Sequence, residues 1–206
     1  MREMAINLQK GQRVDLTKGN PGLTRIMVGL GWDPVQNRGG GGFLGSLFGG
    51  GGGPNIDCDA SVLMLDESGR IRNNSDVIYF GNLKSPEGSV QHTGDNLTGD
   101  GDGDDEQILI DLNRVPAQID KLVFVVNIYD CVKRNQHFGM IQNAFIRIVN
   151  SANNQELIHF NLTDDYSGKT CLVVGEIYRH GGDWKFAAVG NGINVPGLGE
   201  LVRSYS

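Results

Sequence analysis

The sequence predicts an all-β fold, a two-sheet β-sandwich with few short helices. Short runs that alternate between apolar and polar residues recur along the chain, and turns rich in glycine separate them. Strands and long helices do not alternate, which argues against a parallel α/β fold. The 206 residues are enough to bury one hydrophobic core, so we expect a single domain spanning residues 1–206.

Turn signals delimit the strands predicted in the first half. Lys10-Gly11-Gln12 separates two short alternating runs, Asn20-Pro21-Gly22 precedes a third, and Gly81-Asn82 ends a later one. The strands predicted here are residues 5–8, 13–16, 23–30, 58–65 and 77–80.

The second half contains the most apolar run, LVFVVNIY at residues 122–129, which predicts a strand buried on both faces. Residues 179–183, with two adjacent glycines, predict a hairpin between the last two strands. The strands predicted here are residues 108–112, 122–129, 144–149, 157–162, 171–178 and 184–189. Short helices are predicted at residues 132–138 and 198–205.

Residues 39–53 contain ten of the 31 glycines and interrupt the strand pattern. The segment lacks the GK[ST] motif of a phosphate-binding loop, and we expect a flexible surface insertion between two strands. An alternative is that its apolar side chains form an adhesive patch for a partner or a membrane surface. Those side chains are Phe43, Leu44, Leu47 and Phe48.

Charge and apolar content exclude several classes of protein. The net charge is −6, which disfavours a nucleic-acid binder, and six of the 24 acids lie within residues 95–106. No apolar run is long enough to span a membrane, so we do not expect an integral membrane protein. No signal peptide opens the sequence, and the three cysteines form no CxxC pair. We therefore expect a cytoplasmic protein with reduced, buried cysteines.

The acidic loop, residues 94–106 (GDNLTGDGDGDDE), offers oxygen ligands and no nitrogen or sulfur ligands. Calcium takes six to eight such oxygens, and interleaved glycines let a short loop fold around an ion. The loop therefore favours calcium, followed by magnesium, with a solvated charged loop as the alternative.

A second acidic pair, Asp57 and Asp59, brackets Cys58 at the start of a predicted strand. Residues two apart on a strand share a face, so both carboxylates suit the wall of an ion site. A capped strand end is an equal alternative.

Catalytic motifs are absent from the sequence. It contains neither GxSxG nor HExxH, and its four histidines are scattered. His92 lies near the acidic loop, and we expect it to face solvent. The sequence therefore predicts a non-enzymatic protein, with a metal-dependent hydrolase using the same carboxylates as the alternative.

Several long motifs resemble the TerD family over nearly the whole chain. They are INLQKGQRVDLTK, LTRIMVGLGWD, DCDASVLMLD, GDNLTGDGDGDDE, AFIRIVN with ELIHFNLTDD, and GEIYRHGGDWKFAAVGNG, in that order. The insertion at residues 39–53 departs from the family pattern. The resemblance implies a β-sandwich that binds one or two calcium ions between the acidic loop and the acid pair. Carried onto this chain, it implies as ligands Asp57, Asp59, Asp95, Asn96, Asp102, Asp104, Asp105 and Glu106.

The resemblance also implies a role in tellurite and chemical-stress resistance, without an established catalytic activity. We expect calcium to order the acidic loop and to change its charge, so that the protein acts as a calcium-dependent interaction module. Expected partners are other proteins of the stress-resistance system, with the inner membrane surface as one location. The alternatives are a magnesium- or calcium-dependent enzyme acting on phosphoesters or nucleotides, and a structural assembly module.

Overall fold

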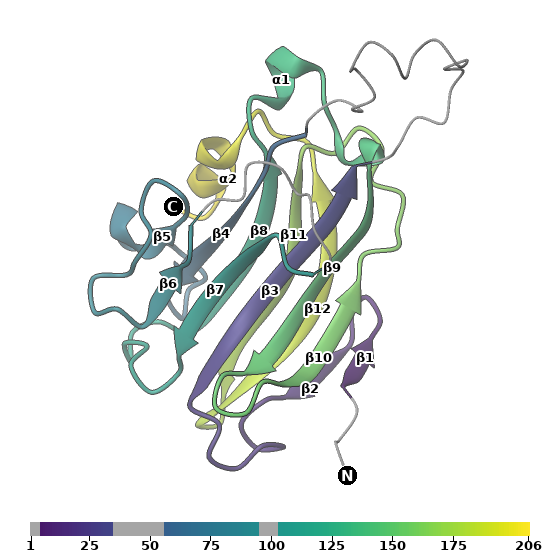
Figure 1. Cartoon of the computed structure of the whole chain (residues 1–206). Coiled ribbons are helices and arrows are strands. Elements are labelled where there is room, and N and C mark those ends of the chain that lie inside the picture. The colour runs from purple at the N-terminus through teal and green to yellow at the C-terminus, as the bar shows by residue number, and fades with distance from the viewer. Residues whose placement is uncertain (1–4, 35–55, 95–102) are drawn as a thin grey trace.

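The computed structural model describes residues 5–34, 56–94 and 103–206, which form two six-stranded sheets packed face to face (Figure 1). Neighbouring strands are antiparallel, except that β1 and β10 are parallel. This arrangement confirms the predicted β-sandwich. The first sheet has the order β1 (Ile6–Leu8), β10 (Gln155–Asn161), β9 (Ile141–Asn150), β3 (Arg25–Pro34), β7 (Glu106–Asp111) and β6 (Val90–His92). The second has the order β2 (Arg13–Asp15), β12 (Asp183–Ile193), β11 (Cys171–His180), β8 (Lys121–Ile128), β4 (Cys58–Leu65) and β5 (Val77–Ile78).

Strand β8 shows why the sequence forms this sandwich. Its alternate residues Phe124 and Val126 point into the core between the sheets, whereas Val123 and Val125 join a second apolar cluster on the outer face. All four are buried, which confirms a strand covered on both sides. Each such side chain contributes roughly 1.5–3 kcal/mol through burial.

Helix α2 (Leu198–Ser204) covers the outer face of the second sheet (Figure 1). Leu201 is 2% exposed and belongs to the same cluster as Leu63 of β4 and Val123 of β8. The chain therefore adds a partial third layer over β4 and β8.

The remaining helical elements in the described ranges are short. They are α1 (Cys131–Arg134) and the 3-10 turns η2 (Asn74–Asp76) and η3 (Phe138–Met140). The helix predicted at residues 132–138 ends early, because Asn135 adopts a left-handed conformation with φ of 50°. Strand β6 was not predicted.

The predicted hairpin between β11 and β12 is confirmed, with Gly181 and Gly182 at positive φ. Strand β3 starts two residues later than predicted, because the Leu23 amide donates to the Asn20 carbonyl and belongs to the preceding turn. It then extends to Pro34. The insertion at residues 39–53 lies outside the described residues.

The three cysteines are buried free thiols, as predicted. Burial, followed by the nearby Cys131 thiol, raises the pKa of Cys171 to about 12. Across the three described ranges, no helix has the length and apolar character to cross a membrane.

We expect stability to fall as the pH rises from 9.0 towards 12. An unfolded Cys171 thiol ionises at its ordinary pKa of 9.0, whereas the folded chain holds the proton until about 12. The contribution of the Cys171 thiol to the free energy of unfolding is therefore complete below pH 9.0 and is lost progressively between pH 9.0 and about 12. Urea unfolding across this range measures the slope, which Cys171→Ala should reduce. Val173→Ala, a buried control on the same strand, should lower stability at every pH without changing the slope; an unchanged slope in Cys171→Ala would contradict the assignment.

Candidate functional site

The acid pair Asp57 and Asp59 lies at the N-terminal end of β4. Asp59 is 3% exposed and faces the outer side of the second sheet, because its neighbour Cys58 faces the core between the sheets. Asn127, the cross-strand partner of Asp59 on β8, donates a hydrogen bond from Nδ2 to Asp59 Oδ2 at 3.4 Å. Asp57 Oδ2 lies 3.6 Å from a guanidinium nitrogen of Arg134 in α1. Two carboxylates therefore stand at the end of β4 near α1.

Glu106, the first residue of β7, joins the two sheets. Its Oε2 atom accepts a hydrogen bond of 2.6 Å from the backbone N–H of Ala60 in β4. The same atom lies 3.1 Å from His92 Nε2. The prediction that His92 faces solvent is wrong: the residue lies in β6 and is 2% exposed. Because the Gly94 N–H donates to His92 Nδ1, the proton is on Nε2 and points at Glu106.

Asp105, which precedes Glu106, forms hydrogen bonds with the backbone of β3. Its Oδ2 atom accepts a hydrogen bond of 2.7 Å from the Trp32 N–H, and its own N–H donates to the Leu30 carbonyl at 2.8 Å. Asp105 is 9% exposed. These bonds extend the pairing of β7 with β3 into the end of the acidic loop.

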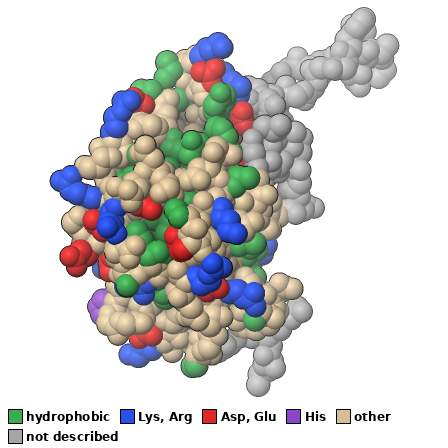
Figure 2. Space-filling view, turned by 90° about the vertical axis from the view of Figure 1, so that its left-hand side faces the viewer, with side chains coloured by type: hydrophobic (Ala, Val, Ile, Leu, Met, Phe, Trp, Pro, Cys, Tyr) green, Lys and Arg blue, Asp and Glu red, His purple; other side chains and the backbone are tan. Residues whose placement is uncertain are grey.

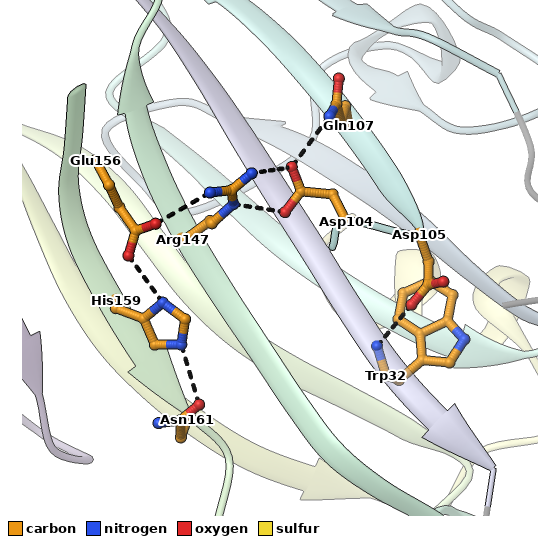
Figure 3. Close-up of polar contacts among 8 residues, drawn as sticks. All are labelled: Trp32, Asp104, Asp105, Gln107, Arg147, Glu156, His159 and Asn161. Carbon is orange, nitrogen blue, oxygen red and sulfur yellow. Dashed lines mark hydrogen bonds and ion pairs between the residues drawn. The ribbon is translucent and has the colours of Figure 1, made fainter. Parts of the chain in front are cut away.

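Asp104 points to the opposite face of the first sheet. Arg147 of β9 holds it in a bidentate ion pair, with nitrogen–oxygen distances of 2.7 and 2.9 Å, and Gln107 Nε2 donates to it at 3.0 Å (Figure 3). The Asp104 side chain is fully buried. Gly29 of β3 makes room for it, because a Cβ atom there would overlap the Asp104 carboxylate. Asp104 is therefore separated from Asp57, although both were predicted as ligands.

A chain of polar contacts continues from Arg147 along the outer face of the first sheet (Figure 3). Arg147 pairs with Glu156 at 3.0 Å, Glu156 lies 2.9 Å from His159, and His159 lies 3.1 Å from Asn161 Oδ1. The hydrogen bonds to Asp104 raise the pKa of Arg147 above its usual range, with a smaller contribution from Glu156. This network fixes the C-terminal end of the acidic loop on β9 and β10.

The other four predicted ligands in the described ranges lie near enough to Cys58, which is 2% exposed, for their charges to act on its thiol. Burial raises the pKa of the Cys58 thiol well above its ordinary value, and the charges of the four acids raise it further. The contributing carboxylates, largest first, are Asp59, Asp57, Glu106 and Asp105. The Ala60 N–H bond to Glu106 thus links the start of β7 to the β4 strand that follows Asp57.

The remaining predicted ligands, Asp95, Asn96 and Asp102, lie outside the described residues. In the chemistry of its donors the described cluster fits calcium, because it consists of carboxylate oxygens. Within residues 56–94 and 103–206, however, no three Asp, Glu, His or Cys side chains form a group that could hold a metal ion. A metal site at this place would therefore need ligands from outside the described residues.

Sequence reasoning missed Asn127, which is 5% exposed and whose Oδ1 atom is buried without a hydrogen-bond partner. A signal was present: Asn127 is the one polar residue in the run LVFVVNI. For His92 the signal was the alternation of Val90, Gln91 and His92, which is typical of a strand.

We expect Gly29→Ala to destabilise the protein by about 1–3 kcal/mol, because the new methyl group overlaps the Asp104 carboxylate. Urea unfolding measures the change. In an Asp104→Ala background the same substitution should cost much less, because the overlapping group is gone. The control is Gly199→Ala in α2, where a Cβ atom meets nothing within 4 Å. Equal costs of Gly29→Ala in the two backgrounds would contradict this account.

Comparison with known proteins relates this chain to a family. Stress response protein SCP2 of Bacillus subtilis (strain 168) is 65% identical over 98% of this chain and 100% of its own length. General stress protein 16U of the same organism is 46% identical, and tellurium resistance protein TerD of Serratia marcescens is 44% identical; each match covers 98% of this chain and 97% of the relative.

Two solved structures share the fold. A protein of unknown function, SAV2460, superimposes with a TM-score of 0.66 at 22% identity, over 88% of this chain and 95% of that one. A homologue of telluride resistance protein TerD from Streptomyces coelicolor A3(2) superimposes with a TM-score of 0.62 at 23% identity, over 84% of this chain and 92% of that one. The TerD domain model matches residues 4–205. This chain belongs to the TerD family, whose members include stress response and tellurium resistance proteins.

Proposed function

We propose that this protein is a non-enzymatic calcium-binding module of a stress-response and tellurium-resistance system. The observation that carries the proposal is the hydrogen bond from the Ala60 N–H to Glu106, which places the end of the acidic loop beside the β4 strand that begins with the Asp57 and Asp59 pair. The names of the relatives support the stress-response and tellurium-resistance part, and none of those named above is an enzyme name.

The electrostatics of the cluster favour a bound cation. Two unit charges 4 Å apart repel by about 4 kcal/mol at an effective dielectric constant of about 20. Arg134 offsets part of the charge at Asp57. His92 adds no positive charge in the tautomer that the Gly94 N–H selects, because its Nδ1 atom is already an acceptor. Bound calcium would add positive charge beside these carboxylates.

We assign the ligands to two groups. The fixed wall consists of Asp57, Asp59, Asp105 and Glu106, which the strands hold in place. The other group is Asp95, Asn96 and Asp102 from the acidic loop, for one or two ions in total. Asp104 instead anchors the loop end through Arg147, because both of its oxygens are engaged there.

Ordering of the acidic loop is the proposed output. Calcium would reduce the negative charge of the strongly acidic residues 95–106 and order the part of the loop that precedes Asp104, which changes the surface offered to other proteins. We place this association in the cytoplasm, with other proteins of the resistance system and with the inner membrane surface as one location.

Calorimetric titration of the metal-free protein should detect one or two calcium sites. Asp59→Asn and Asp105→Asn should each weaken binding by about tenfold or more, because each removes a charged ligand. Asp104→Asn should lower the free energy of unfolding, because it weakens the pair with Arg147. Its effect on calcium affinity should be smaller than that of Asp59→Asn or Asp105→Asn. The matched control is Glu67→Gln, which removes an exposed charge outside the cluster and should leave affinity unchanged.

Silence with calcium would contradict the proposal. Tighter binding of magnesium, together with phosphoester turnover that is lost in Asp105→Asn, would favour the enzymatic alternative. Equal weakening by Glu67→Gln and Asp59→Asn would show that only net charge matters, and would contradict the assigned ligands.

A further inference from the structure

A hollow of about 320 Å³ opens on the outer side of the second sheet, between the ends of β4 and β8 and the start of α2. Figure 2 shows this side of the molecule, where hydrophobic side chains gather among charged ones. Its buried polar lining consists of Asp59 and Asn127, at 3% and 5% exposure. Phe80 and Tyr129 form the rim, at 44% and 47% exposure.

Asn127 contributes a hydrogen-bond acceptor to this hollow. Its Nδ2 atom donates a hydrogen bond to Asp59 Oδ2, whereas its Oδ1 atom is buried and has no hydrogen-bond partner. A buried carbonyl oxygen without a partner is uncommon in folded proteins. The Asn127 acceptor therefore calls for a donor, and the Asp59 carboxylate lies beside it.

The walls of the hollow are aromatic. Tyr79, Phe80 and Tyr129 follow one another edge to face, with ring centres 5.2 and 6.2 Å apart. Aromatic faces attract cations within about 6 Å of the ring centre. The chain already uses this chemistry at the rim, where the Arg134 guanidinium lies 5.6 Å from the Tyr129 ring centre and 3.6 Å from Asp57.

The charge of the lining is negative. Asp59 and Asp130 contribute carboxylates, and none of the described residues that line the hollow is Lys, Arg or His; outside the lining, Lys133 lies 3.6 Å from Asp130. The volume exceeds that of a metal ion, and aromatic walls provide no oxygen ligands for one. An organic cation fits this lining better than a metal ion does.

We propose that this hollow binds a primary ammonium group carried on an aliphatic chain. An ammonium has three donors and no acceptor, which suits Asn127 Oδ1 and Asp59 together. It is a compact charge, whereas a guanidinium needs a carboxylate with both oxygens available, and Asn127 already donates to Asp59 Oδ2. The aliphatic chain packs against the exposed surfaces of the Phe80 and Tyr129 rings, which contact each other edge to face.

The same chemistry occurs in a lysine side chain of a partner protein and in a free diamine. Nuclear magnetic resonance of the ¹⁵N-labelled full chain, recorded in the presence of a metal chelator, tests both sources of the ammonium group. The probes are Nα-acetyl-lysine-methylamide, a lysine-containing peptide and cadaverine. We expect a saturable shift of the Asn127 side-chain amide, with a Kd of about 1 mM or tighter. Equal affinity for cadaverine would identify a free amine as the ligand, and a preference for the peptide would identify a protein partner.

Variants make the test specific. Asn127→Leu should weaken binding by about tenfold or more, which corresponds to the loss of one well-placed acceptor. Phe80→Ala, at the exposed rim, should also weaken it without affecting folding. The control is Leu83→Ala, a residue of similar exposure outside the lining. The Nε-acetylated lysine, which is neutral, should not bind.

Absence of a localised shift, or an equal shift with the acetylated probe, would overturn the proposal. The chelator separates this result from the calcium proposal, because ammonium binding requires no metal. Amine binding without calcium binding would support the ammonium site and contradict the calcium proposal. Calcium binding without amine binding would contradict the ammonium site alone.

Discussion

The bond from the Ala60 N–H to Glu106 connects the two sheets at the point on which the rest of the site depends. Glu106 comes from β7 of the first sheet and Ala60 from β4 of the second. The bond places the end of the acidic loop beside the acid pair on β4. Because Glu106 is 2% exposed, its charge is held in a region with little water, where hydrogen bonds to charged groups are strong.

The three consecutive acids at the end of the loop have three different partners. Asp104 turns outward to Arg147, Asp105 accepts from the Trp32 N–H, and Glu106 crosses to β4. Contacts within the protein therefore hold the end of the acidic loop in position without a bound ion. This fixed end separates an anchoring acid from two acids that face the β4 pair, although the sequence presents them as one run.

Local patterns made most of the fold predictable. The continuous apolar run at residues 122–129 predicts a β8 buried on both faces, and Gly181-Gly182 predicts the last hairpin, because both depend on neighbouring residues. The three-residue strand β6 was missed because so short a run carries little periodicity. The family resemblance pointed to the acids, but it did not separate Asp104 from Asp105. That separation depends on Arg147, which lies 43 residues beyond Asp104, and on the space above Gly29.

The central claim is that an ion binds between the β4 pair and the start of β7. A crystal structure of the calcium-loaded protein, with an anomalous difference map, tests this claim most directly. The account predicts one or two peaks within bonding distance of Asp59, Asp105 or Glu106, with Asp104 still paired to Arg147. A peak centred on Asp104 after loss of the Arg147 pair, or no peak at saturating calcium, would contradict it.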